Sequence, residues 1–163
     1  MINVHLFDGS TYTRGGPELI QLPLADKALL WIDIEHEPID SEQAIFDQFG
    51  CYPLTIQDAR RLRHPPKIEH FTDQSFVLLR ELVADHESLA FDTLQVAGFI
   101  GSNFLITRHD KPSPAISSWQ DSAKLSGLMA RGPMVLFASV TNSMGLAYLE
   151  LLLDFEPALS EYE

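Results

Sequence analysis

The sequence predicts an α/β fold: a layered domain with a mixed, largely antiparallel sheet flanked by helices, followed by the start of long acidic helices. Three observations support this prediction. Short stretches with period-two alternation open the chain, four strand-like runs follow between residues 67 and 108, and helical patterns begin at residue 114. A regular alternation of strands and helices is absent, so the sheet should be built mainly from hairpins.

The strands are predicted from alternating side chains bounded by turn residues. Residues 2–7 and 28–35 alternate apolar and polar side chains, whereas residues 8–16 have the composition of a turn. The clearest hairpin turn is Gly101-Ser102. The later strands are predicted over residues 67–71, 75–83, 90–100 and 103–108, with helices on both faces of the sheet.

The first helices are predicted from capping and proline signals. Asp40 or Ser41 can cap a helix that runs through Phe49 and is closed by Gly50. Pro53 can begin a second helix, over residues 54–62, because proline lacks only an N–H that the first helical position does not use. The pair Pro65-Pro66 ends it.

The last third of the chain is predicted to be helical. One helix should cover residues 114–125, and after a break at 127–133 a longer one should run from Pro133 to the end. This last segment is rich in leucine and acidic residues, with no base after Arg131. We therefore expect an α/β domain over 1–125 and the start of a helical region over 126–163.

Composition narrows the function classes. The 163-residue chain is 45% apolar, has one cysteine (Cys51) and carries a formal charge of −12. One cysteine cannot form an internal disulfide, and this charge would repel the phosphates of nucleic acid. No signal peptide is visible at the N-terminus, and no stretch is predicted to be apolar over the ~20 residues that a membrane span requires.

Catalytic motifs are missing from the sequence. The six histidines are scattered without chelating spacing, and none of the glycine-rich phosphate loops or nucleophile elbows is present. Asp33, Glu35 and Glu37 should share one strand face and could bind a divalent cation, or serve an unrecognised enzyme. The alternative is an ordinary solvated face. We predict that the chain is not an enzyme.

A basic cluster stands out against the acidic background. Four of the eleven Lys and Arg residues lie within eight positions: Arg60, Arg61, Arg63 and Lys67. They could complement the carboxyl end of the helix over 54–62, with Asp58 and Arg61 paired at i, i+3. They could instead bind an anion or a partner. The residues alone leave both interpretations open.

Several short motifs in order carry a family resemblance. They are WID at 31–33, FGCYPL at 49–54, QDA at 57–59 and PPKIE at 65–69, with further fits at 72–80 and 96–109. Together they resemble the N-terminal cytoplasmic domain of the CorA-type divalent-cation transporter family. The resemblance is good over residues 28–125 and loose elsewhere.

The resemblance implies a regulatory role and not a nucleic-acid patch. An aspartate of the family that takes part in sensing intracellular cation at a protomer interface maps to Asp58. The implied ligand is Mg²⁺, or another divalent cation such as Co²⁺, Ni²⁺ or Zn²⁺, bound weakly. The implied partners are further copies of the chain, as a homopentamer in the full-length transporter, with the membrane reached only through C-terminal helices beyond these residues.

The departures from the family pattern concern the same region. Gln57 stands where the family has Glu, Tyr52 where it has His, and Pro65 where it has Arg. The pore, with its Gly-Met-Asn signature, and the stalk carboxylate also lie outside these residues. We therefore expect an exposed Asp58, no ordered ion and a soluble, monomeric or weakly associated chain.

The resulting hypothesis is a cytoplasmic regulatory domain of a CorA-like Mg²⁺ transporter, located on the cytoplasmic side of the cell membrane, that senses intracellular cation and gates the channel. The alternatives are a zinc-type transporter of the same superfamily, or a free-standing interaction or ligand-binding module without a channel. Selectivity belongs to the pore, so the transported ion is not encoded in these residues.

Overall fold

The computed structural model describes residues 1–85 and 90–160. Seven strands form one sheet in the order β2-β1-β3-β7-β6-β5-β4. The strands are β1 (Ile2–Phe7), β2 (Tyr12–Gly15), β3 (Leu29–Glu35), β4 (Lys67–His70), β5 (Ser75–Asp85), β6 (Ala90–Ile100) and β7 (Phe104–His109). Only β3 and β7 pair in parallel, and all other neighbours are antiparallel. The predicted mixed, largely antiparallel sheet is confirmed.

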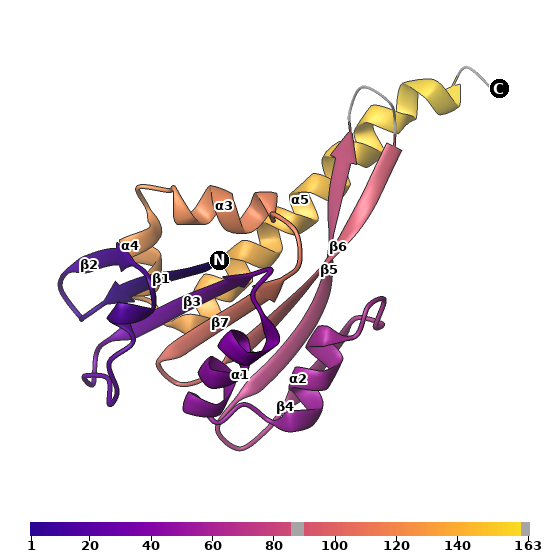
Figure 1. Cartoon of the computed structure of the whole chain (residues 1–163). Coiled ribbons are helices and arrows are strands. Elements are labelled where there is room, and N and C mark those ends of the chain that lie inside the picture. Colours follow the sequence, from indigo (N-terminus) through magenta and orange to yellow (C-terminus); the bar gives the residue numbers. More distant parts are fainter. Residues whose placement is uncertain (86–89, 161–163) are drawn as a thin grey trace.

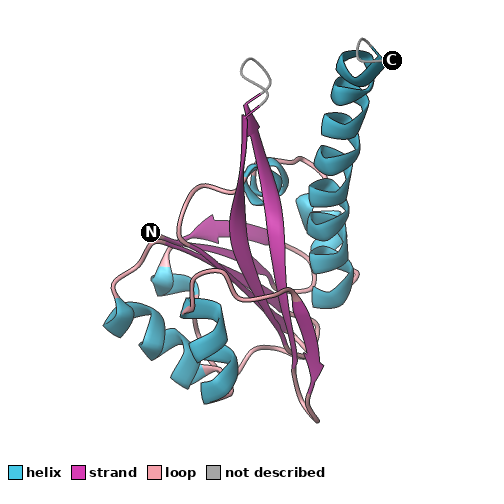
Figure 2. Ribbon diagram, turned by 90° about the vertical axis from the view of Figure 1, so that its right-hand side faces the viewer, coloured by secondary structure: helices cyan, strands magenta, loops and turns pink. Residues whose placement is uncertain are grey.

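Helices cover both faces of this sheet (Figure 2). One face carries α1 (Ile39–Gln48) and α2 (Pro53–Arg60), and the other carries α3 (Pro114–Gln120), α4 (Leu125–Met129) and α5 (Pro133–Ser160). A 3-10 turn, Pro17–Leu19, follows β2. Each face has its own apolar core, and β3 contributes to both because its side chains alternate between them.

The strand expectations differ from the structure in a few places. Residues 12–15 form β2, although they lie in a segment that the sequence predicts as a turn. This short edge strand pairs with β1 and has no buried residue, so it lacks an apolar signal. The strand predicted over residues 75–83 continues to Asp85 as β5, and residues 86–89 lie outside the described part.

The helix expectations differ mainly at the ends. The N-cap of α1 is Pro38, without a side-chain cap, and Asp40 lies in the first turn. Gly50, with φ of +62°, follows the C-cap as predicted. The helix α2 begins at Pro53 and ends at Arg60, two residues earlier than predicted. The helix expected over 114–125 ends at Gln120, and α4 occupies part of the predicted break.

The long helix α5 extends beyond the body of the domain, alongside the ends of β5 and β6 (Figure 1). Its first half is anchored in the core by Leu136, Phe137 and Val140. The ring of Phe137 packs on Gly98 of β6, where an added Cβ would lie 2.5 Å from the ring. Further along, the hydroxyl of Tyr148 donates to the carbonyl of Arg80 on β5 at 3.0 Å.

The same helix corrects one expectation from the sequence. By length and composition, residues Pro133–Pro157 of α5 are apolar enough to cross a membrane, at a mean hydropathy of 1.4. This contradicts the prediction that no stretch of the sequence is apolar over the length of a membrane span. Part of this apolar surface is core, since the first half of α5 packs on the sheet. Apolar side chains of the second half are exposed: Leu146, Leu149, Leu152 and Leu153.

Candidate functional site

The candidate site lies at α2 and the turn that leads from it to β4. Pro53 occupies the first turn of α2, and the hydroxyl of Thr55 donates to the carbonyl of Tyr52 at 2.7 Å. Thr55, Ile56 and Ala59 form the buried face of this helix. Asp58 lies at the edge of this face and is partly buried, whereas Leu54 and Gln57 are exposed.

Asp58 is held by residues that follow the helix. Its Oδ2 forms an ion pair with Lys67 at the start of β4, and its Oδ1 lies 3.3 Å from Nε2 of His64. The Asp58 side chain is 19% exposed. The hydrogen bond from Lys67 to Asp58 raises the pKa of Lys67. The sequence predicted an exposed carboxylate or a pair with Arg61; the structure shows a partly buried carboxylate paired across the turn.

Of the residues near Asp58 that depart from the family pattern, Tyr52 has structural partners of its own. The phenol of Tyr52 stacks on Phe71, with ring centroids 4.1 Å apart, and its hydroxyl donates to Asp73 at 3.0 Å. Gln57 is exposed. The Asp58 carboxylate is already neutralised by the ammonium group of Lys67. A cation would have to displace Lys67 to gain this carboxylate as a ligand.

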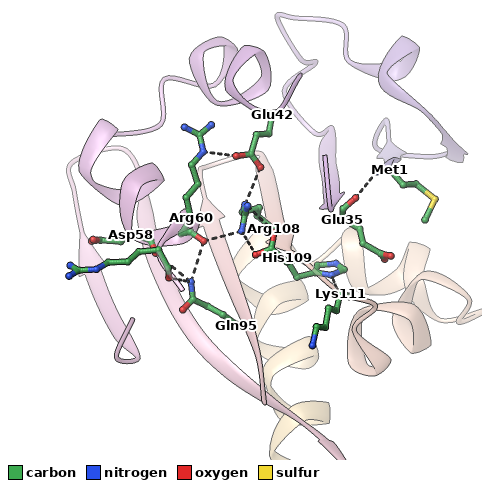
Figure 3. A network of polar contacts seen from close by, with 12 residues as sticks. Met1, Glu35, Glu42, Asp58, Arg60, Gln95, Arg108, His109 and Lys111 are labelled. Atoms are coloured by element: carbon green, nitrogen blue, oxygen red, sulfur yellow. Dashed lines mark hydrogen bonds and ion pairs between the residues drawn. The ribbon is translucent and has the colours of Figure 1, made fainter. Parts of the chain in front are cut away.

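Arg60 connects the basic cluster to the interior. Its Nε donates to Oε1 of Glu42 on α1 at 2.5 Å, and Arg108 of β7 donates from Nε to the other oxygen, Oε2, at 3.0 Å (Figure 3). The Glu42 side chain is only 1% exposed. Arg108 also pairs with Asp110 at 3.0 Å. Two cations therefore hold one buried carboxylate, which makes Arg60 a structural residue.

Glu42 and Arg108 were missed by reasoning from the sequence. A signal for Glu42 was available, because it precedes Ile45 and Phe46 by three and four positions and so shares the buried face of α1. Its partners were not predictable, since Arg60 and Arg108 come from two other elements. The basic cluster is thus divided: Arg60 and Lys67 are engaged in ion pairs, whereas Arg61 and Arg63 are exposed.

Gln95 of β6 anchors the turn after α2. Its Nε2 donates to the carbonyls of Arg61 (3.0 Å) and Ala59 (3.2 Å), and its Oε1 accepts from the backbone N–H of His64 at 3.1 Å. Arg80 of β5 adds a contact of 3.4 Å to the carbonyl of His64. The end of α2, where the backbone N–H of the C-cap residue Arg61 donates to the carbonyls of Gln57 and Asp58, is thereby also fastened to the sheet by side chains.

The predicted carboxylate face of β3 is not formed. Asp33 is 1% exposed, and its carboxylate accepts from Thr107 (2.5 Å), His109 (3.0 Å) and Gln120 (2.8 Å). Its face of β3 is covered by α3, so Asp33 is enclosed and not solvated. The hydroxyl of Thr107 in turn accepts from the indole of Trp31 at 3.0 Å.

Glu35 and Glu37 do not join Asp33 in a cluster. The N-terminal ammonium of Met1 donates to the carbonyl of Glu35 at 2.5 Å and forms an ion pair with the carboxylate of Glu37. Within residues 1–85 and 90–160, no group of three or more His, Cys, Asp or Glu side chains is arranged to hold a metal ion. A cation site made of these three carboxylates is therefore not assembled in the folded chain.

His109 is bound on both ring nitrogens. Nε2 contacts Asp33, and Nδ1 lies 2.6 Å from the carbonyl of Lys111, which can only accept. Both nitrogens must therefore donate, as in imidazolium. Burial lowers the pKa of His109, but the hydrogen bond and charge of Asp33 and the Lys111 carbonyl outweigh burial, so the pKa is raised above its ordinary value.

His5 has the opposite environment. It is fully buried, stacks on Trp31 with centroids 4.9 Å apart, and its Nδ1 lies 2.8 Å from the hydroxyl of Tyr12. Its Nε2 has no partner in the described structure. Burial, followed by the charge of Arg14, lowers the pKa of His5 to about 4. This histidine is neutral at physiological pH.

One family model matches most of the chain. Residues 26–163 match the family model described as "CorA-like Mg2+ transporter protein". Over 140 residues the chain is 28% identical to YfjQ of Bacillus subtilis (strain 168), a protein provisionally named as a metal ion transporter. That alignment covers 85% of this chain and 42% of YfjQ, so the chain spans less than half of this relative.

Solved structures share the fold. The full-length CmaX protein superposes with a TM-score of 0.80 at 13% identity, covering 98% of this chain and 49% of CmaX. The ZntB cytoplasmic domain from Vibrio parahaemolyticus RIMD 2210633 gives a TM-score of 0.68 at 16% identity, covering 99% of this chain and 65% of that domain. At such identities these likenesses establish the fold. With the family model matched from residue 26 to residue 163, the chain belongs to the CorA-like Mg²⁺ transporter family.

Proposed function

We propose that this chain is the cytoplasmic regulatory domain of a divalent metal-ion transporter, with Mg²⁺ as the cation. The observation that carries the proposal is the family match over residues 26–163. The fold shared with a domain described as cytoplasmic supports the same location. No catalysed reaction is part of the proposal. The chain would bind cation and transmit a conformational change to a channel formed by a longer protein, as a homopentamer.

Asp58 is the residue through which we expect the cation to act. In the chain alone its carboxylate is occupied by Lys67 and His64, and the carboxylate of Glu69 is paired with the same Lys67 ammonium group. Mg²⁺ keeps most of its water in such a site, so its affinity should be millimolar or weaker. A second carboxylate from a neighbouring copy would be needed to outcompete Lys67, which makes binding dependent on assembly.

Calorimetry of the chain with Mg²⁺ tests the ligand. Asp58→Asn should abolish the weak binding, and Lys67→Gln should strengthen it, because the competing ammonium group is removed. Asp26→Asn is a matched control, since Asp26 is an exposed carboxylate outside this site. Tight binding to the unmodified chain, or equal losses in the Asp58 and Asp26 variants, would place cation sensing elsewhere.

Protection from proteolysis tests the gating role in the full-length transporter. A cation shifts a gate only through its differential affinity for the closed state. Mg²⁺ should therefore protect the unmodified protein, and Asp58→Ala should require higher Mg²⁺ for the same protection. Repeating the titration with Zn²⁺ and Co²⁺ ranks the cations. Protection that is unchanged in the Asp58→Ala protein would contradict regulation through this residue.

A further inference from the structure

An open cavity of about 470 Å³ lies on the α2 side of the sheet, beyond the end of that helix. Its walls come from β5, β6, the turn after α2 and the turn after β7. Five charged residues line it: Arg63, Arg80, Asp92, Asp110 and Lys111. The volume is within the range of cavities that take small ligands. The cavity is separate from Asp58, which is not among its lining residues.

The charges in this cavity are not balanced internally. The carboxylate of Asp110 accepts from both terminal nitrogens of Arg108, at 3.0 and 3.1 Å. Asp92 is paired with Lys111 at 3.3 Å. Among the described residues, neither Arg63 nor Arg80 forms an ion pair with a carboxylate. The charge of Arg63 acts on Asp92 without an ion pair, so two guanidinium groups outside ion pairs share one hollow of a chain whose net charge is −12.

The turn that carries Arg63 is fixed in place. Arg63 has a φ of +59°, a left-handed conformation that costs a non-glycine residue on the order of 1 kcal/mol. Gln95 binds the carbonyl of Arg61 on one side of it and the N–H of His64 on the other. Arg80 reaches the carbonyl of His64 (3.4 Å) and the hydroxyl of Thr93 (3.5 Å), both long contacts that a stronger acceptor could replace. The cavity is thus bordered by a turn whose backbone is fixed by Gln95, and by the side chains of Arg63 and Arg80, which can change their contacts.

We propose that this cavity is a binding site for a small phosphate-bearing molecule. Guanidinium groups match the oxygens of a phosphate in pairs, and hydrogen bonds between ionised partners are stronger than neutral ones. Arg63 and Arg80 would bind the phosphate. Lys111, whose pair with Asp92 is exposed to solvent, can turn from that carboxylate to the ligand. The overall negative charge opposes approach of an anion, so the affinity should be modest and should come from these local contacts.

Titration calorimetry with inorganic pyrophosphate, at constant ionic strength and without divalent cation, tests the site. Saturable binding is expected. Arg63→Gln and Arg80→Gln should each weaken it by about tenfold, the effect of losing one charge-assisted hydrogen bond. Asp92→Asn should strengthen binding, because it removes a carboxylate and releases Lys111. Arg131→Gln, which deletes the same charge at an exposed position outside the cavity, should leave the affinity unchanged.

The opposite results would overturn the proposal. They are an absence of saturable binding both to pyrophosphate and to phosphatidic acid vesicles, or a loss in Arg131→Gln equal to that in Arg63→Gln, which would indicate non-specific charge effects. Arg63 is exposed, so Arg63→Gln should keep the wild-type thermal unfolding midpoint, and this check separates lost binding from lost folding. Sedimentation with phosphatidic acid vesicles, against phosphatidylcholine vesicles, then distinguishes a lipid headgroup from a free phosphate compound as the source. Arg63-dependent binding in either arm supports the site, and its absence from both rejects it.

Discussion

His109 on β7 donates a hydrogen bond of 3.0 Å to Asp33 on β3, and both side chains are almost completely buried. The two strands are the parallel pair at the centre of the sheet, with Glu35 directly opposite His109. Gln120 at the end of α3 binds the other oxygen of Asp33, at 2.8 Å. This buried pair therefore connects the centre of the sheet to the helical layer above it.

The first prediction concerns the pH dependence that His109 introduces. Because its folded pKa is raised, the pair contributes stability fully below the unfolded pKa of about 6.5 and loses it as pH rises through the folded value. The free energy of unfolding of His109→Gln, compared with that of the wild type, should therefore show its largest deficit at low pH. Urea unfolding between about pH 5 and pH 9, an interval that brackets the ordinary histidine pKa, measures this difference in unfolding free energy. His70→Gln, at an exposed site, is the control.

The second prediction concerns His5, for which the change of stability with pH has the opposite sign. Its pKa of about 4 lies below the ordinary 6.5, so the unfolded chain binds a proton in this interval and the folded chain does not. The folded state should lose stability as pH falls from 6.5 towards 4, by about 3 kcal/mol for this shift. His5→Gln should remove that part of the slope. An identical pH profile for the variant and the wild type would show that the pKa of His5 does not change on folding.

The third prediction concerns the buried carboxylate of Glu42. Glu42→Gln leaves Arg60 and Arg108 without their shared counter-ion, and removing one partner of a buried ion pair typically costs about 3–5 kcal/mol. Chemical denaturation measures the loss. Glu69→Gln breaks an exposed pair with Lys67 and should cost less than about 1 kcal/mol. Similar losses in the two variants would mean that the Glu42 cluster is not important for stability.

The fourth prediction concerns self-association of the chain alone. At low ionic strength we expect a monomer in sedimentation experiments, because copies that each carry −12 charges repel one another. The exposed leucines of α5, such as Leu149 and Leu152, favour association, so added salt should promote it by screening the repulsion. Leu149→Glu should suppress this salt effect, whereas Leu22→Glu, at an exposed site remote from α5 in the sequence, should not. A stable pentamer at micromolar concentration and low salt would contradict the prediction.

Local patterns in the sequence determined most of the secondary structure. Alternation and turn chemistry predicted β1, β3 and the strands from Lys67 to His109, including the hairpin at Gly101-Ser102. They failed at β2, because a short edge strand with no buried side chain carries no apolar signal. Proline positions located the start of α2 and of α5 correctly, since proline is tolerated in the first helical turn.

Only the tertiary structure decided what the charged residues contact. Alternation places Asp33 on the face of β3 opposite to Leu30, Ile32 and Ile34. Whether the face with Asp33 is solvated depends on α3, which comes about eighty residues later and covers it. Asp58 pairs with Lys67 and not with Arg61, because the turn after α2 brings β4 back beside the helix. Glu42, Arg60 and Arg108 come from three elements and meet only when both helices pack on the sheet. The sequence by itself determined which residues alternate along strands, begin helices and form turns. Long-range packing determined which carboxylates are buried, paired or free to bind a cation, because the contacts of each carboxylate come from elements distant along the chain.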